Sequence, residues 1–275
     1  MPKQLNNSIS TAVNTPLSEV VHGLFNYGID GDIISGGMLG NTNPDVYAES
    51  AAALATIGTR LRMKDGREFI YCRNGAAEIG IAKMGQAEAP TGNWNEVAQA
   101  SHGWSVGDTS GSIVLTGTAP AVNEFAEGWM VVNKGTGIGQ CYRISTNTSH
   151  ATLPSISLYD PIITAFPEGS EVTIIKSNFA DTIVVATGGL TAVAVGVPLI
   201  TVTACYYYWS QVKGPAPLIV DTDETVIIGL PVTCPATCAV AGTCGPAVTL
   251  ENHYGHCMFV AAAAEPAVVN LDLGI

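Results

Sequence analysis

The sequence predicts an all-β protein with a sandwich or barrel-like body of short antiparallel strands, a mostly irregular N-terminal arm and one or two short helices. Short segments rich in Val, Ile, Thr and aromatic residues recur along the chain, each bounded by Gly, Pro, Asn or Ser. Such segments at near-regular spacing are typical of sandwiches and barrels. Charged residues make up only 12% of the 275 residues, about half the usual share of roughly 25%, so we expect much surface to be buried against partners.

The predicted arm covers residues 1–48, which are rich in Asn, Ser, Thr and Gly. One short helix is expected over residues 16–26, because Pro16 suits the first helical turn and Thr15 can cap it. The segment has too little apolar surface to offset its own ordering entropy, so we expect it to order on a partner, with its own domain as the alternative. Its candidate contacts are the apolar side chains Leu17, Val21, Leu24 and Phe25.

The predicted β-rich body covers residues 49–275, and a division into two sub-domains near residue 180 is left open. The stretch "TRLRMKDGREFIYCR" predicts two strands joined at Asp65 and Gly66, a favoured hairpin pair. Short helices are expected over residues 46–58 and 119–128. The strand pattern continues in "GSIVLTG", "GWMVVN", "GQCYRIS", "SISLYD", "EVTIIKS", "TIVVAT", "LITVTACYYYW", "APLIVD", "TVIIGLPV" and "HCMFVAAAA".

The charge distribution argues against a nucleic-acid partner. The chain carries a net charge of −12 and has no Lys or Arg after Lys213, whereas neutralising phosphates requires cations. Five basic residues between positions 60 and 73 alternate with apolar ones, which indicates the polar face of a strand pair. We therefore expect no nucleic acid to bind.

No membrane span is expected either. Residues 182–212 carry no charge, but Gly, Pro and Thr break this run into short β-branched segments that fit buried strands better. The N-terminus holds no apolar run fit for a signal peptide, so synthesis in a reducing cytoplasm is expected.

Two motifs suggest chemistry but have simpler interpretations. The stretch "GTGIGQ" at residues 135–140 has the wrong spacing for a dinucleotide loop, and a strand follows it where a helix is required, so it predicts a glycine-rich hairpin. Asp221, Asp223 and Glu224 could serve hydrolysis or bind calcium, but "VDTDETVIIG" reads as a solvated turn between two strands. No catalytic residue and no cofactor is expected.

A cluster of cysteines and histidines lies between residues 233 and 257. It supplies enough soft ligands for a tetrahedral zinc, from Cys234, Cys238, Cys244, His253, His256 and Cys257. The gaps of three and five residues between the first cysteines do not match zinc ribbons, and adjacent His256 and Cys257 would point to opposite faces of a strand. We favour buried free thiols acting as small apolar residues, with a zinc site or a Cys234–Cys244 disulfide as alternatives.

The order of the strands resembles that of head proteins of tailed phages, especially the decoration (cement) type of marine and cyanobacterial phages. The resemblance runs from about Gly58 to Ile275 and is most specific in the "DGREF" hairpin and in "YWSQVKGPAPLIV". It implies a non-enzymatic virion protein on the outer capsid, made in the host bacterial cytoplasm. Its implied partners are the major capsid protein and further copies of itself, as a homotrimer.

Two rival functions remain open. One is a virion hydrolase or tailspike-like protein acting on host surface glycan through carboxylates such as Asp221 and Glu224. The other is a head fibre that binds glycan through exposed aromatic residues. In the run "YYYWSQ", Tyr207 and Trp209 are candidate subunit or capsid contacts, because Trp and Tyr are enriched at interface hot spots; the alternative is that this run fills the core.

Overall fold

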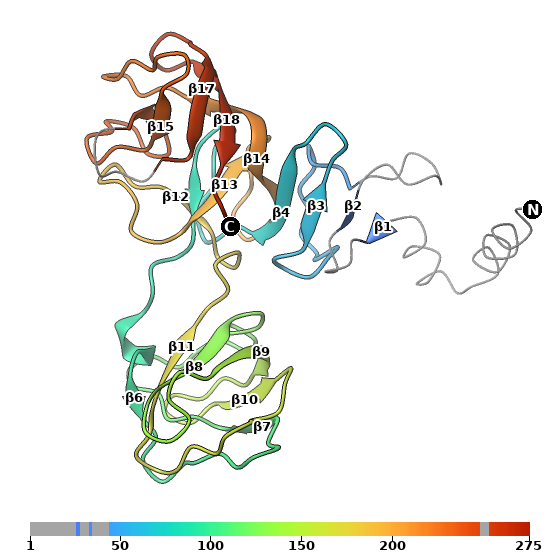
Figure 1. Ribbon diagram of the computed structural model, residues 1–275, viewed down its shortest axis with the longest axis vertical. Coiled ribbons are helices and arrows are strands. Elements are labelled where there is room, and N and C mark those ends of the chain that lie inside the picture. The colour runs from blue at the N-terminus through green and yellow to red at the C-terminus, as the bar shows by residue number, and fades with distance from the viewer. Residues whose placement is uncertain (1–25, 28–32, 35–43, 248–252) are drawn as a thin grey trace, which may run out of the picture. The chain divides into compact units, whose positions relative to one another are not determined.

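The computed structural model describes residues 26–27, 33–34, 44–247 and 253–275, and the fold of these residues is all-β, as predicted (Figure 1). Besides strands it contains a single short 3-10 helix, η1 (Gly92–Trp94), within the described ranges. The chain forms two compact units. The first unit comprises residues 1–86 and 181–275, and the second comprises residues 87–180. Each unit contains one curled, mainly antiparallel sheet.

The sheet of the first unit runs in the order β1-β2-β3-β4-β14-β18-β17-β15-β16, with β5, β12 and β13 attached beside this path. Its strands are β1 (Asn26–Tyr27), β2 (Ile33–Ile34), β3 (Arg60–Arg62), β4 (Glu68–Arg73), β5 (Gly85–Gln86), β12 (Ile183–Val184), β13 (Ala194–Pro198), β14 (Tyr207–Ile219), β15 (Pro231–Thr233), β16 (Gly245–Pro246), β17 (Gly255–Phe259) and β18 (Pro266–Asp272). The predicted hairpin at Asp65 and Gly66 is confirmed, since β3 pairs antiparallel with β4 and Gly66 has a φ of +88°.

The longest strand, β14, joins two segments that the sequence predicts as separate strands. Its first half pairs with β4 and its second half with β18. The change of partner coincides with a register shift between Gln211 and Lys213 and with Gly214, whose φ of +83° favours glycine. This irregularity lets one continuous strand serve both halves of the sheet.

The sheet of the second unit runs in the order β6-β11-β8-β9-β10-β7. Its strands are β6 (Val97–Ala98), β7 (Ser110–Ser112), β8 (Trp129–Lys134), β9 (Cys141–Asn147), β10 (Ser155–Leu158) and β11 (Glu171–Ile175). Alternate residues of β8, β9 and β11 are buried, so one face of this sheet covers a core. The glycine-rich hairpin predicted at residues 135–140 is confirmed, because β8 pairs antiparallel with β9.

Two predicted helices are absent from the described residues, and both predictions are wrong for a local reason. In residues 46–58, the N–H and C=O of Ser50 bond to Tyr207 at 2.9 and 2.8 Å, so this segment is held against β14 instead. In residues 119–128, Asn123 and Glu127 adopt left-handed backbone angles and the side chain of Asn147 bonds to Phe125 N and Ala121 O. The helix predicted over residues 16–26 lies outside the described residues except for Asn26, which begins β1.

Part of the predicted arm joins the sheet of its own unit. Ile33 and Ile34 in β2 pair in parallel with Leu61 and Arg62 in β3, and β1 pairs with β2. These four residues therefore pair with the protein's own sheet, which is the alternative that the sequence left open for the arm. The candidate contacts Leu17, Val21, Leu24 and Phe25 lie outside the described residues.

Candidate functional site

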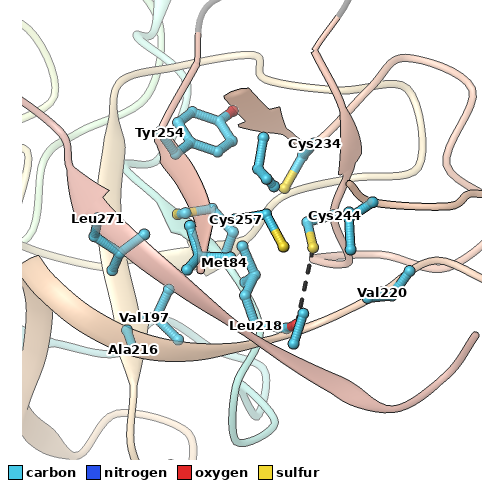
Figure 2. Close-up of a cluster of buried hydrophobic side chains, with 14 of the residues drawn as sticks. Met84, Val197, Ala216, Leu218, Val220, Cys234, Cys244, Tyr254, Cys257 and Leu271 are labelled. Atoms are coloured by element: carbon cyan, nitrogen blue, oxygen red, sulfur yellow. Dashed lines mark hydrogen bonds between the residues drawn. The ribbon is translucent and has the colours of Figure 1, made fainter. Parts of the chain in front are cut away.

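The cysteine cluster lies inside the core of the first unit. Cys234, Cys238, Cys244 and Cys257 are at most 5% exposed. Figure 2 shows Cys234, Cys244 and Cys257 among Met84, Leu218 and Tyr254, with the Cys244 thiol donating to the carbonyl of Leu218 at 3.8 Å. These cysteines therefore lie in the core, which is where we expect free thiols that act as small apolar residues.

The thiols are held in their protonated form. Burial raises the pKa of Cys244 to about 12 and raises the pKa of Cys234 well above its usual value. Burial also raises the pKa of Cys257. Since the thiolate is the nucleophile and the metal ligand, these groups are poor at both roles. Cys234, Cys244 and Cys257 are free thiols, so the alternative disulfide between Cys234 and Cys244 is not formed.

The six candidate zinc ligands do not converge. His253 and His256 are exposed, with ring centroids 6.0 Å apart, whereas the four cysteines face the core. The alternation of β17 places His256 outside and Cys257 inside, as the sequence predicts. No group of three or more His, Cys, Asp or Glu side chains in the described part of the chain could hold a metal ion.

Asp221 is a buried structural carboxylate, so the predicted solvated turn is wrong for this residue. Its side chain accepts hydrogen bonds from Val240 N at 2.9 Å, Ala239 N at 3.2 Å and Thr243 Oγ1 at 2.6 Å. Burial acts to raise its pKa, but the hydrogen bonds from Thr243 and Val240 outweigh that effect and lower the pKa to about 2. The carboxylate thereby fixes the turn that precedes Cys244, and its acceptor positions are occupied.

Trp209 is a core residue of its own chain, which corrects its prediction as a subunit or capsid contact. It is 6% exposed and packs at 4.9 Å between ring centroids against Tyr71. Tyr207 stacks on Tyr71 with the ring centroids 5.9 Å apart, and it is half-buried. The alternative in which alternate members of the run fill the core therefore applies to Trp209.

A partly buried ion cluster connects the two ends of the second unit. Lys176 Nζ lies 2.6 Å from Glu88 Oε2 and 2.6 Å from Glu124 Oε1, and 5.6 Å from the centroid of the Trp94 ring. Burial would lower the pKa of Lys176, but the bonds to Glu124 and Glu88 raise it. Sequence reasoning missed this cluster, because its three charged members lie far apart along the chain.

A row of alternating charges crosses four strands of the first unit. Register places Arg62 on β3 opposite Glu68 on β4, Glu68 opposite Lys213 on β14, and Lys213 opposite Asp272 on β18. The sequence predicted a polar strand-pair face here. We call the basic surface the set Arg60, Arg62, Lys64, Arg67 and Lys213, of which three share the carboxylate of Glu68 at 3.8–4.0 Å.

A second surface of the first unit is apolar. Two backbone hydrogen bonds, from Gly229 N to Cys257 O and from Cys257 N to Leu230 O, hold residues 227–230 beside residues 257–260. Both segments expose large apolar side chains, with Phe259 66% and Ile228 59% exposed. We call the apolar surface the set Ile227, Ile228, Leu230, Met258, Phe259 and Val260. Large exposed apolar patches are common at sites where proteins bind partners.

The outer face of the second unit carries a row of mixed chemistry. Register aligns Ile175 on β11 with Trp129 on β8 and Trp129 with Arg143 on β9, and Tyr159 N donates to Arg143 O at 3.0 Å. Trp129 and Tyr159 are 44% and 52% exposed, and the Arg143 guanidinium lies 5.1 Å from the Tyr159 ring. Glu127 pairs with Arg143 and accepts a bond from the Tyr159 hydroxyl.

Comparison with known proteins finds no matching family model, no matching curated protein and no matching solved structure. Within the described ranges, no helix has the length and apolar character needed to cross a membrane. The uncharged run over residues 182–212 contains β12, β13 and the start of β14.

Proposed function

We propose that the chain is a non-enzymatic virion structural protein that decorates and reinforces the outer surface of a tailed-phage head. The observation that supports it best is the apolar surface, six large apolar side chains exposed on two adjoining segments in a chain with only 12% charged residues. Side chains of this kind are normally covered by a partner. The resemblance of the strand order to decoration proteins supplies the identity of that partner.

In this proposal the partners are the major capsid protein and further copies of the chain, in a homotrimer. Residues 1–25 supply the lattice contact, through Leu17, Val21, Leu24 and Phe25. Residues 26–27 and 33–34 are left out of this contact, because as β1 and β2 they extend the protein's own sheet. A clamp confined to the first 25 residues can order on a neighbour without unpairing a strand.

The test is binding of two forms to purified capsids that lack the protein. Deleting residues 1–25 should leave the β-type circular dichroism spectrum unchanged and reduce occupancy at least tenfold. A second variant keeps the full length and carries four substitutions: Leu17→Ser, Val21→Ser, Leu24→Ser and Phe25→Ser. It should lose the same occupancy, which would assign the effect to these four side chains. If the truncated form binds as tightly as the intact chain, the arm is not the attachment segment.

A second function is favoured by the row on the outer face of the second unit. Exposed Trp129 and Tyr159 flank Arg143, which Glu127 holds in place. Flat aromatic rings beside fixed hydrogen-bonding groups suit binding of a glycan, so a head fibre is the alternative function. A glycan array probed with the intact protein and with the variant Trp129→Ala tests it. Hydrolysis through Asp221 has little support, because that carboxylate is buried and fully bonded.

A further inference from the structure

Four large side chains form a row across the outer face of the second unit's sheet. They belong to β11, β8, β9 and the residue after β10, which are neighbours in the sheet (Figure 1). Register aligns Ile175 with Trp129 and Trp129 with Arg143, and Tyr159 N donates to Arg143 O. We call this set the aromatic row: Ile175, Trp129, Arg143 and Tyr159. Neighbouring strands lie about 4.8 Å apart, so the backbones along the row span about 14 Å.

Two members of the aromatic row are fixed by a largely buried carboxylate. Glu127 accepts a hydrogen bond from the Tyr159 hydroxyl at 2.5 Å and forms an ion pair with Arg143, and its side chain is only 12% exposed. The guanidinium also lies 5.1 Å from the centroid of the Tyr159 ring. The ring and the guanidinium therefore hold one arrangement before any ligand arrives, which lowers the entropy lost on binding.

The turn before β8 adopts an unfavourable conformation to place this carboxylate. Glu127 has a φ of +63°, in the left-handed region that favours glycine, and its N–H bonds to Ile144 O at 2.9 Å. Gly128 follows, where a Cβ would collide with Ile175 O, so only glycine fits between Glu127 and Trp129. Strained residues of this kind are enriched at ligand sites, which agrees with a binding role for the aromatic row.

The aromatic row offers rings and hydrogen-bond donors without net charge. Arg143 and Glu127 neutralise each other, and a guanidinium has five N–H donors, so it can donate to a ligand while it stays paired. The next row on the same face has the smaller side chains Thr173, Val131 and Cys141. The large side chains thus form a narrow strip that suits one extended chain, whereas a protein partner typically covers about 800 Å² of each surface.

From this combination we infer that the aromatic row binds a linear, uncharged polysaccharide that lies across the strands. A pyranose ring has an apolar face of C–H groups, which can stack on an aromatic ring, and hydroxyls at its edge, which can accept from a guanidinium. The row is longer than one sugar ring, so successive rings contact Trp129, Arg143 and Tyr159. The inference rests on glycan binding, proposed above as the alternative function, and adds the class of glycan, its direction and its contacts.

The distribution of the chain's tryptophans allows a test on the intact protein. Trp94, Trp104 and Trp209 are at most 6% exposed and Trp129 is 44% exposed, so quenching of fluorescence by acrylamide reports mainly Trp129. The probes are β-1,4-linked oligomers of glucose, N-acetylglucosamine and mannose, with oligomers of galacturonic acid as the acidic comparison. At least one neutral series should protect Trp129 from quenching. Its affinity should rise about tenfold from the single sugar to the trisaccharide, because the longer chain reaches a second aromatic ring.

Variants assign the binding to the aromatic row. Trp129→Ala and Tyr159→Ala should each weaken binding of the trisaccharide about tenfold in calorimetry, because each removes one stacking surface. Tyr159→Phe keeps the ring and removes only its bond to Glu127, so it should weaken binding less than Tyr159→Ala. The matched control Ile138→Ala removes an exposed apolar side chain from the β8–β9 hairpin and should bind like the parent. If thermal unfolding shows that a variant is destabilised, the quenching titration of the intact protein decides.

Three results would overturn the inference and leave the capsid-binding proposal untouched. Binding of the acidic oligomers alone, or equal affinity for the single sugar and the trisaccharide, refutes the linear, uncharged ligand while glycan binding itself stands. Protection of Trp129 that grows with protein concentration in the absence of sugar means that a second copy covers the aromatic row. If no probe binds, the inference fails, and the glycan array then decides the alternative function separately.

Discussion

Glu88 Oε2 lies 2.6 Å from Lys176 Nζ, and this contact joins the first and last segments of the second unit. In the first unit, Gln86 pairs with Ile183 in the β5–β12 pair, so the two chain ends on that side are also adjacent. The second unit is therefore a single insertion in the sequence of the first unit. Contacts hold its own two chain ends together, and the β5–β12 pair does the same for the two chain ends of the first unit.

We predict that residues 87–180 fold alone. Their core, from Trp94 to Ile174, is formed entirely by residues of this segment. The isolated fragment should give a β-type circular dichroism spectrum and a cooperative urea transition. The first unit, with residues 87–180 replaced by Asn-Gly, should also fold, because Asn-Gly together with Asp181 and Thr182 forms a four-residue hairpin loop between the paired residues Gln86 and Ile183. A fragment without a cooperative transition would show that the second unit depends on the first.

We predict that Lys176→Met destabilises the second unit by about 2 kcal/mol, because it leaves Glu88 and Glu124 close together without their shared cation. The matched control is Lys134→Met, which removes an exposed pair with Glu171 and should change the stability much less, because solvent screens an exposed pair. Guanidinium unfolding of the full chain, followed by tryptophan fluorescence, measures both. Equal effects would mean that the cluster adds no more than an exposed pair.

We predict that Asp221 makes the first unit sensitive to acid. Its folded pKa of about 2 lies below the unfolded value of about 3.9. Its contribution is therefore fully present above the unfolded value and is lost as pH falls from about 5 to 2, for a total of about 2.5 kcal/mol. In Asp221→Asn the stability at pH 7 should fall by a similar amount and its slope between pH 5 and 2 should flatten. Asp223→Asn, at an exposed neighbour, should keep the parent slope.

We predict that chelators leave the melting temperature of the protein unchanged. The thiols of Cys234, Cys244 and Cys257 face the core with raised pKa values, and His253 and His256 point elsewhere. A structural zinc would instead couple its binding energy to folding. Elemental analysis that finds near one zinc per chain, together with a melting temperature that falls in chelator, would refute this prediction.

Local sequence signals predicted the strands well where the chain reverses within a few residues. Asp65 and Gly66 marked the β3–β4 hairpin, and the glycines at 135–139 marked the β8–β9 hairpin. The failures are non-local. Nothing near residues 46–58 in sequence reveals that Ser50 bonds to Tyr207, and nothing near Asn123 reveals that Asn147 binds its loop; "VYAESAAALATIG" therefore reads as a helix by composition alone.

The candidate site shows the same limit. His256 and Cys257 are adjacent in a predicted strand, and this was enough to place their side chains on opposite faces. Burial of Asp221 was not predictable, because its partners Val240 and Thr243 come from a turn much later in the sequence. The apolar surface combines two segments that are well separated along the chain, and only the strand pairing brings them together.

The placement of the thiols gives the first unit a chemical reporter of its own opening. The second unit holds one cysteine, Cys141, which is exposed, and the exposed Cys205 belongs to the first unit. Once these two are capped, the remaining five react only when the first unit opens, because an alkylating reagent must reach a buried sulfur: Cys72, Cys234, Cys238, Cys244 and Cys257. Their labelling rate, read by mass spectrometry of the protein, would measure how often the first unit opens, and the inserted unit would contribute no signal.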